Sequence, residues 1–143
     1  MNKRFQAKAT INLNAPVSQL WDALINPEII RQYFWGTNAV SDWKKGSPLY
    51  FRGEWEGKSY EDKGIILDIQ KERMLRYTHW SSFTGEADIP ENYMTITYFV
   101  SGNERKSTWE VEMDNIRSEE AAAHSVTNWN AVMASLKALL EKE

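Results

Sequence analysis

The chain has 143 residues and no cysteine, and its 17 Lys and Arg against 20 Asp and Glu give a formal net charge of −3 at pH 7. The lack of cysteine excludes disulfides, thiolate zinc sites and cysteine nucleophiles, and it suits a reducing cytoplasm, where we expect the protein to reside. The acidic balance argues against a nucleic-acid partner, and no apolar run reaches the ~18 residues that a membrane span needs. The length predicts a single domain, residues 1–143.

Aromatic residues are abundant, with 7 Trp, 6 Tyr and 5 Phe. Large rings can simply fill a core, or they can line a cavity, because ligand pockets are mostly apolar and aromatic. The stretch NPEIIRQYFWG raises this question most sharply, since it places Tyr33, Phe34 and Trp35 in consecutive positions before Gly36. Both interpretations stay open at this point.

The first elements in chain order are a strand and two short helices. Apolar residues alternate with polar ones over residues 5–13, which predicts a half-buried strand. The next segment has apolar residues at the helical spacing i, i+3, i+4 and i+7, and these are Val17, Leu20, Trp21 and Leu24. Asn14 is the expected N-cap of this helix. A second helix is predicted to start after Asn26 and to end at Gly36.

The middle of the chain reads as strands separated by turns. A short strand precedes Trp43, and alternation continues over residues 47–57, 64–70, 74–80, 94–100 and 107–113. The turn SGNERK predicts a hairpin between the last two strands. Alternation places Leu75, Tyr77 and His79 on one face. It also places Asp68 opposite Leu67, hence toward solvent.

After Ser118 the spacing becomes helical again. Ser118 is the expected N-cap, and the apolar stripe that follows consists of Ala122, Val126, Trp129, Met133, Leu136 and Leu140. A sheet with one apolar face must bury it, and this helix is the only predicted element long enough to cover it. We therefore predict an α+β helix-grip fold. A curved antiparallel sheet of about six or seven strands wraps around a long C-terminal helix, and two short helices follow the first strand.

Three segments carry a family resemblance, namely APVSQLWDALINPEIIRQYFWG, GIILDIQKERMLRYTHW and NWNAVMASLKALLE. In their order and spacing these segments resemble proteins that are similar to the C-terminal domain of the activator of heat-shock-protein-90 ATPase. That family belongs to the START-like (Bet v 1-like) or SRPBCC superfamily. This resemblance implies a helix-grip fold with an internal cavity. It also implies binding of apolar small molecules or lipids, a chaperone partner for some members, and cyclase or hydrolase activity in a few. The superfamily shares no catalytic motif, so no catalytic residue is assigned.

The candidate cavity residues are the large side chains that alternation and helical spacing direct inward. They are Trp35, Trp43, Phe51, Trp55, Tyr77, His79, Tyr98, Trp109, Trp129 and Met133. Gly53 joins them because its missing side chain is expected to leave volume between Phe51 and Trp55. Trp35, at a helix end, is the ring expected to reach the mouth of the pocket.

The two histidines each have a functional and a structural interpretation. His79 either hydrogen-bonds a ligand or acts as an acid or base, or it is a core histidine paired with the hydroxyl of Tyr77 or Tyr98. His124 follows Glu120 by one helical turn, which is compatible with two metal ligands side by side. Because no third ligand accompanies them, we interpret them as an exposed i, i+4 pair and expect neither a metal nor a cofactor.

Three functional hypotheses follow. The first is binding of a small apolar ligand or lipid in an aromatic-lined cavity between the sheet and the last helix. The second is an interaction module that modulates the ATPase of a chaperone, heat-shock protein 90. The third is an enzyme of the cyclase or hydrolase kind that uses His79 and a tyrosine.

Overall fold

The described residues form one seven-stranded antiparallel sheet and three α-helices. The computed structural model describes residues 5–81 and 86–141, with Trp55 described in its backbone alone. The strands are β1 (Phe5–Leu13), β2 (Asn38–Ser41), β3 (Pro48–Trp55), β4 (Lys58–Gln70), β5 (Met74–His79), β6 (Met94–Gly102) and β7 (Ser107–Ile116). The helices are α1 (Val17–Ile25), α2 (Pro27–Tyr33) and α3 (Glu119–Leu140), and a 3-10 turn covers Pro90–Asn92.

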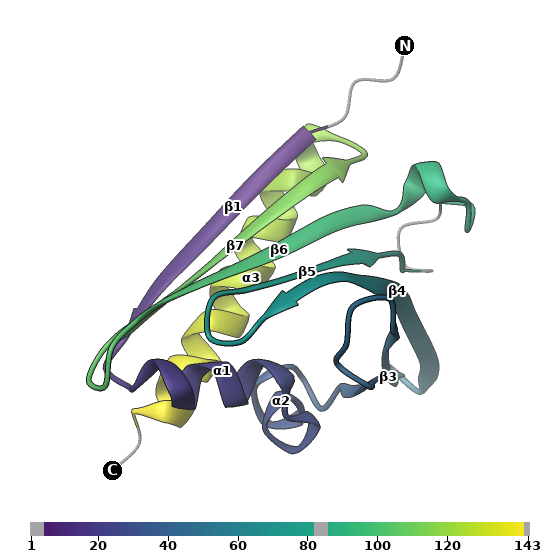
Figure 1. Cartoon of the computed structure of the whole chain (residues 1–143). Helices are drawn as coiled ribbons and strands as arrows, with labels where there is room; N and C mark the ends of the chain where they lie inside the picture. The colour runs from purple at the N-terminus through teal and green to yellow at the C-terminus, as the bar shows by residue number, and fades with distance from the viewer. Residues whose placement is uncertain (1–4, 82–85, 142–143) are drawn as a thin grey trace.

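The sheet wraps around α3 on one face. Its strand order is β1-β7-β6-β5-β4-β3-β2, so the edges are β1 and the four-residue β2. In Figure 1, α3 runs behind β6 and β7, while α1 and α2 lie together at the lower end. Helix α3 packs against β1, β7 and α2. This arrangement confirms the predicted helix-grip fold, including the two short helices after the first strand and the hairpin between β6 and β7.

The apolar stripe of α3 is buried against the sheet as predicted. Trp129, Met133 and Leu136 are buried in it, and they face alternate residues of β7, where Trp109 and Val111 are fully buried. Burial of apolar surface at about 25 cal/mol per Å² is the main stabilising contribution to such a core. The inward residues of the strands and the apolar stripe of α3 therefore pack into one hydrophobic core.

The helix ends confirm one predicted cap and correct another. The Ala121 N–H donates to Ser118 Oγ at 3.0 Å, so Ser118 caps α3. The prediction for Asn14 is wrong, because α1 begins after an extended Pro16 and has no side-chain cap. The first helical N–H, that of Val17, donates instead to the carbonyl of Asn103 in the β6–β7 turn at 2.9 Å. A backbone acceptor thus replaces the side-chain cap.

Strand β4 departs from strict alternation. Its register against β5 shifts between Ile66 and Asp68, which indicates a β-bulge at Leu67. Ile66 is fully buried while Leu67 is 40% exposed, so the predicted inward direction of Leu67 is wrong. Asp68 is partly buried, and its carboxylate accepts a hydrogen bond from the Ile69 N–H at 2.9 Å. Because the bulge adds one residue to β4, the residues after Leu67 that point inward are those that would otherwise point outward.

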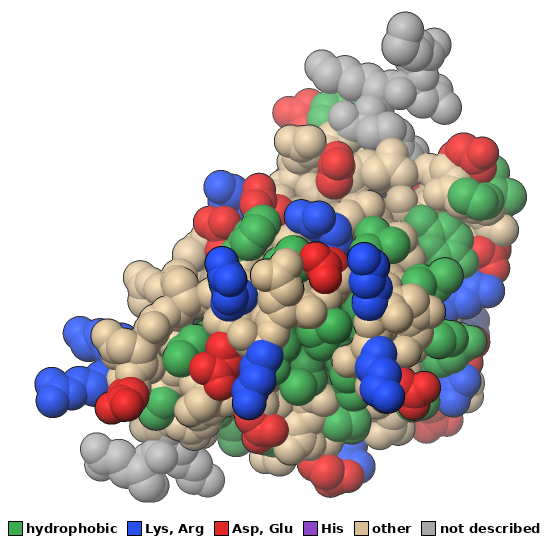
Figure 2. Space-filling view, in the orientation of Figure 1, with side chains coloured by type: hydrophobic (Ala, Val, Ile, Leu, Met, Phe, Trp, Pro, Cys, Tyr) green, Lys and Arg blue, Asp and Glu red, His purple; other side chains and the backbone are tan. Residues whose placement is uncertain are grey.

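The outer surface mixes charged and apolar side chains. On the face shown in Figure 2, Lys and Arg side chains alternate with Asp and Glu, and apolar patches lie between them. Exposed apolar residues on outward strand positions include Val40, Ile65 and Phe99. In residues 5–81 and 86–141, no helix has both the length and the apolar character needed to cross a membrane.

Candidate functional site

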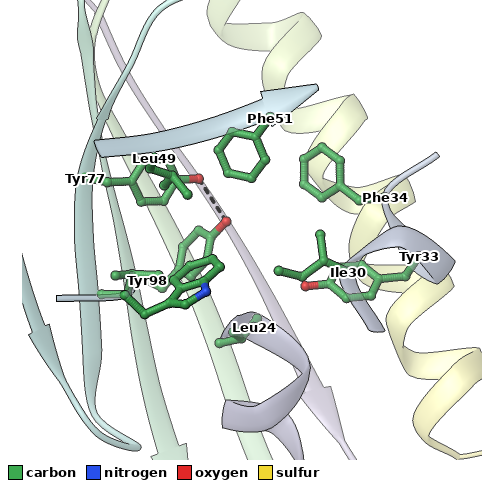
Figure 3. Close-up of a pocket in the computed structure, with 10 residues that line it drawn as sticks. Leu24, Ile30, Tyr33, Phe34, Leu49, Phe51, Tyr77 and Tyr98 are labelled. Carbon is green, nitrogen blue, oxygen red and sulfur yellow. Dashed lines mark hydrogen bonds between the residues drawn. The ribbon is translucent and has the colours of Figure 1, made fainter. Parts of the chain in front are cut away.

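A small cavity lies between the sheet and the first two helices. Ten side chains surround it, namely Leu24, Ile30, Tyr33, Phe34, Trp43, Leu49, Phe51, Leu75, Tyr77 and Tyr98. The labelled side chains in Figure 3 point toward one another from α1, α2 and the strands. Four of the ten were predicted from the sequence as cavity residues, and these are Trp43, Phe51, Tyr77 and Tyr98. Their inward direction follows from strand alternation, except for Trp43, which follows β2.

The cavity holds little open space. Its volume is about 10 Å³, roughly what a single buried water requires. The aromatic-lined cavity that the sequence predicts is therefore almost filled by its own side chains in the described part of the chain. The rings close on one another instead, and any ligand larger than water must displace a side chain.

The hydroxyl groups around the cavity are satisfied internally. The Tyr77 and Tyr98 hydroxyls lie 2.8 Å apart, and the Tyr33 hydroxyl donates to the Ala23 carbonyl at 2.9 Å. Burial raises the pKa of each of these three tyrosines, so all three stay protonated at neutral pH. The wall therefore presents hydrocarbon and ring surface to whatever enters.

Phe34 contacts both the cavity wall and the aromatic core behind it. Its ring stacks on Phe51 with a centroid distance of 5.9 Å and meets Trp129 edge-on at 5.8 Å. Trp129 in turn lies perpendicular to Trp109, at 5.9 Å between centroids. Trp109, Trp129 and Met133 are thus buried behind the cavity wall rather than in it.

Two sequence expectations are corrected here. Trp35 is 60% exposed and has a positive φ of 51°, which turns its ring outward against the edge of Phe34. Gly53 leaves no open space, because a Cβ on it would lie 2.6 Å from the hydroxyl oxygen of Tyr60. Tyr60 is its cross-strand neighbour, and its hydroxyl lies 2.5 Å from Thr37 Oγ1. The side chain of Trp55 lies outside what the structure describes.

His79 has a partner that the sequence did not point to. Its Nε2 lies 3.4 Å from Asp62 Oδ2, whereas the hydroxyls of Tyr77 and Tyr98 bond to each other. The expected tyrosine partner for His79 is therefore wrong. Asp62 occupies an inward position of β4, opposite Phe51, inside a run of polar residues. The signal that could have found it is its cross-strand register with Phe51 across the β3–β4 hairpin.

The second histidine lies apart from this region. His124 and Glu120 are both exposed on α3. No group of three or more His, Cys, Asp or Glu side chains placed to hold a metal ion occurs in the described parts of the chain.

The chain has relatives of the same fold. It matches the family model described as "Activator of Hsp90 ATPase homolog 1-like protein" over residues 14–141. A solution structure from Cytophaga hutchinsonii is 42% identical, with a TM-score of 0.83 and coverage of 99% of this chain and 97% of that one. Comparison with curated proteins gives no match.

Two more distant structures share the fold. A crystal structure from Chromobacterium violaceum is 16% identical, with a TM-score of 0.77 and coverage of 96% of this chain and 98% of that one. The solution structure of the Aha1 dimer from Colwellia psychrerythraea is also 16% identical, with a TM-score of 0.75 and coverage of 96% and 97%. Because the family match spans most of the sequence, the chain belongs to the Activator of Hsp90 ATPase homolog 1-like family.

Proposed function

We propose that the protein binds a small, flat, apolar molecule in the interior between the sheet, α1 and α2. The observation that carries this proposal is the character of the cavity wall, whose ten side chains are apolar or aromatic and whose tyrosine hydroxyls already have partners. Such a wall favours a hydrocarbon or aromatic ligand over a charged one, because an ion would find no compensating group there. The closed form then corresponds to the protein without ligand.

Phe34 is the side chain whose displacement would admit the ligand. It follows the last residue of α2, and the next two residues, Trp35 and Gly36, have positive φ values of 51° and 74°. A non-glycine residue in this region is a source of backbone strain. Phe34 therefore lies directly before a strained turn, and it is only partly buried. A ligand that takes its place would stack on Phe51 and meet Trp129.

Naphthalene is a suitable probe for this site. We expect Phe34→Ala to bind naphthalene at least about tenfold more tightly than the wild type. The reason is that an open state populated to about 10% or less lowers apparent affinity by that fraction, and removal of the ring lifts this penalty. Titration followed by amide shifts in NMR spectra gives both the affinity and the location.

The matched control is Phe99→Ala, which removes the same ring from an outward position of β6. This variant should bind naphthalene as the wild type does. Failure of both the wild type and Phe34→Ala to bind, with each variant still folded by circular dichroism, would refute the proposal. Native mass spectrometry of protein from its own host then identifies the ligand that is retained.

A second candidate function is modulation of a chaperone ATPase, and the observation that favours it is the exposure of Trp35. A tryptophan that is 60% exposed and held by strained backbone is unusual on a free surface, and tryptophan is enriched among residues that dominate protein interfaces. The family description names an activator of the Hsp90 ATPase. In such a role, the exposed ring of Trp35, next to Phe34 at the end of α2, would contact the chaperone.

The test of this candidate is the ATPase rate of Hsp90 from the same host. If Trp35 is a central contact, Trp35→Ala should need at least about tenfold more protein for half-maximal stimulation. Phe99→Ala, an apolar loss elsewhere on the surface, should stimulate normally. An ATPase rate that saturating wild-type protein leaves unchanged counts against this function.

A further inference from the structure

We infer that His79 and Asp62 form a polar anchor for a hydrogen-bond donor on the ligand. The ligand would then be an apolar molecule that carries one O–H or N–H group, such as a phenol. This inference rests on the proposed function, and it adds the chemistry by which a ligand would be oriented. It draws on the position of the pair, on two buried atoms without partners, and on the acceptor character of those atoms.

The pair borders the cavity wall. Asp62 on β4 lies directly opposite Phe51 on β3. The His79 ring lies 5.9 Å from the ring of Phe51 and 6.5 Å from that of Tyr77, measured between centroids. Both of these neighbours line the cavity. A donor group on a ligand that contacts Phe51 or Tyr77 would therefore lie close to the pair.

The pair has unused hydrogen-bonding capacity. Its contact joins His79 Nε2 to Asp62 Oδ2, while His79 Nδ1 and Asp62 Oδ1 are shielded from water and have no partner within the described residues. Buried polar atoms of this kind are rare in folded proteins, because an unmade hydrogen bond costs free energy. Both side chains nevertheless keep exposures of 17% and 18%, so the pair lies where the interior approaches the surface.

The chemistry of the two atoms selects the ligand group. A carboxylate can only accept, so a neutral His79 whose Nε2 faces Asp62 would carry its proton on Nε2 and present Nδ1 as an acceptor. Asp62 Oδ1 is an acceptor as well. We expect a ligand hydroxyl or N–H to donate to His79 Nδ1, whereas a carboxylate or phosphate group on the ligand would be repelled by Asp62. The anchor therefore excludes anionic amphiphiles such as fatty acids.

The test compares naphthalene with 2-naphthol, which differs by one hydroxyl group. In the wild type, we expect the ratio of the naphthalene Kd to the 2-naphthol Kd to be about tenfold larger than in His79→Phe, because the variant keeps a ring but loses the acceptor. The Kd of naphthalene itself should change less than about twofold between the two proteins. As a second control, 2-methoxynaphthalene keeps the oxygen but has no donor, and its affinity should be the same for both.

The outcomes separate this inference from the proposed function. If naphthalene binds but the ratio is the same in His79→Phe, the anchor is refuted and the apolar site stands. If neither probe binds the wild type, both proposals fall. Should His79→Phe lose cooperative unfolding, His79→Leu replaces it, since leucine is apolar and also removes the acceptor nitrogen. A ratio unchanged in His79→Leu refutes the anchor in the same way.

Discussion

Trp109→Ala is expected to lower the free energy of unfolding by about 3–5 kcal/mol. Trp109 is 0% exposed and lies at the centre of the aromatic core, with ring centroids 5.3 Å from Tyr98 and 5.9 Å from Trp129. Its loss leaves a cavity whose lining cannot collapse easily, because the surrounding rings hold one another in place. Urea unfolding followed by circular dichroism measures the change.

Trp35→Ala is the matched control, since it removes the same side chain from a position that is 60% exposed. We expect its effect to stay within about 0.5 kcal/mol. The contrast decides whether the tryptophans of this chain act as core or as surface residues. Equal losses in the two variants would contradict the placement of Trp109 behind the cavity and of Trp35 outside it.

Gly64→Ala should destabilise the sheet by at least about 3 kcal/mol, the upper end of the usual cost of overpacking. A Cβ at this position would lie 1.6 Å from the carbonyl oxygen of Thr78 and 2.4 Å from its carbonyl carbon. Because these are backbone atoms, no side-chain rotation relieves the overlap, and β4 must separate from β5. The two backbone hydrogen bonds between Lys63 and Trp80, at 3.0 and 2.8 Å, lie beside this point.

Amide hydrogen exchange at Lys63 and Trp80 should therefore speed up in Gly64→Ala along with the fall in global stability. Gly53→Ala provides the comparison. Its Cβ would meet only the end of the Tyr60 side chain, which can move at the cost of its hydrogen bond to Thr37, or about 1 kcal/mol. If Gly64→Ala is no worse than Gly53→Ala, the close approach of the two strands is refuted.

The fold could be predicted from the sequence because its periodicities are long and regular. Alternation over β6 and β7 and the stripe on α3 each repeat enough times to outweigh single exceptions. The prediction failed at Leu67, where one bulged residue exchanges the two faces of β4. A bulge leaves no pattern in a single sequence, since it depends on how β4 pairs with β5.

The site was predicted less completely than the fold. Alternation predicted an inward direction for Phe51, Tyr77 and Tyr98, and these three residues line the small cavity, but alternation could not determine how closely rings on different elements pack. Trp35 was expected at the mouth, and the wall ring is Phe34, because the left-handed backbone at Trp35 turns that side chain outward. Conformations of this kind at a non-glycine residue depend on tertiary contacts, so local sequence does not reveal them.

The hydrogen bond between the hydroxyls of Tyr77 and Tyr98, on neighbouring strands, couples the effects of substitutions at these two positions. Exchange of either tyrosine for phenylalanine would strand the other hydroxyl in an apolar interior, whereas exchange of both would remove the polar requirement. A lineage moving toward a wholly hydrocarbon interior must therefore cross a less stable intermediate. This hydrogen bond therefore limits the order in which the two tyrosines can be replaced without a loss of stability.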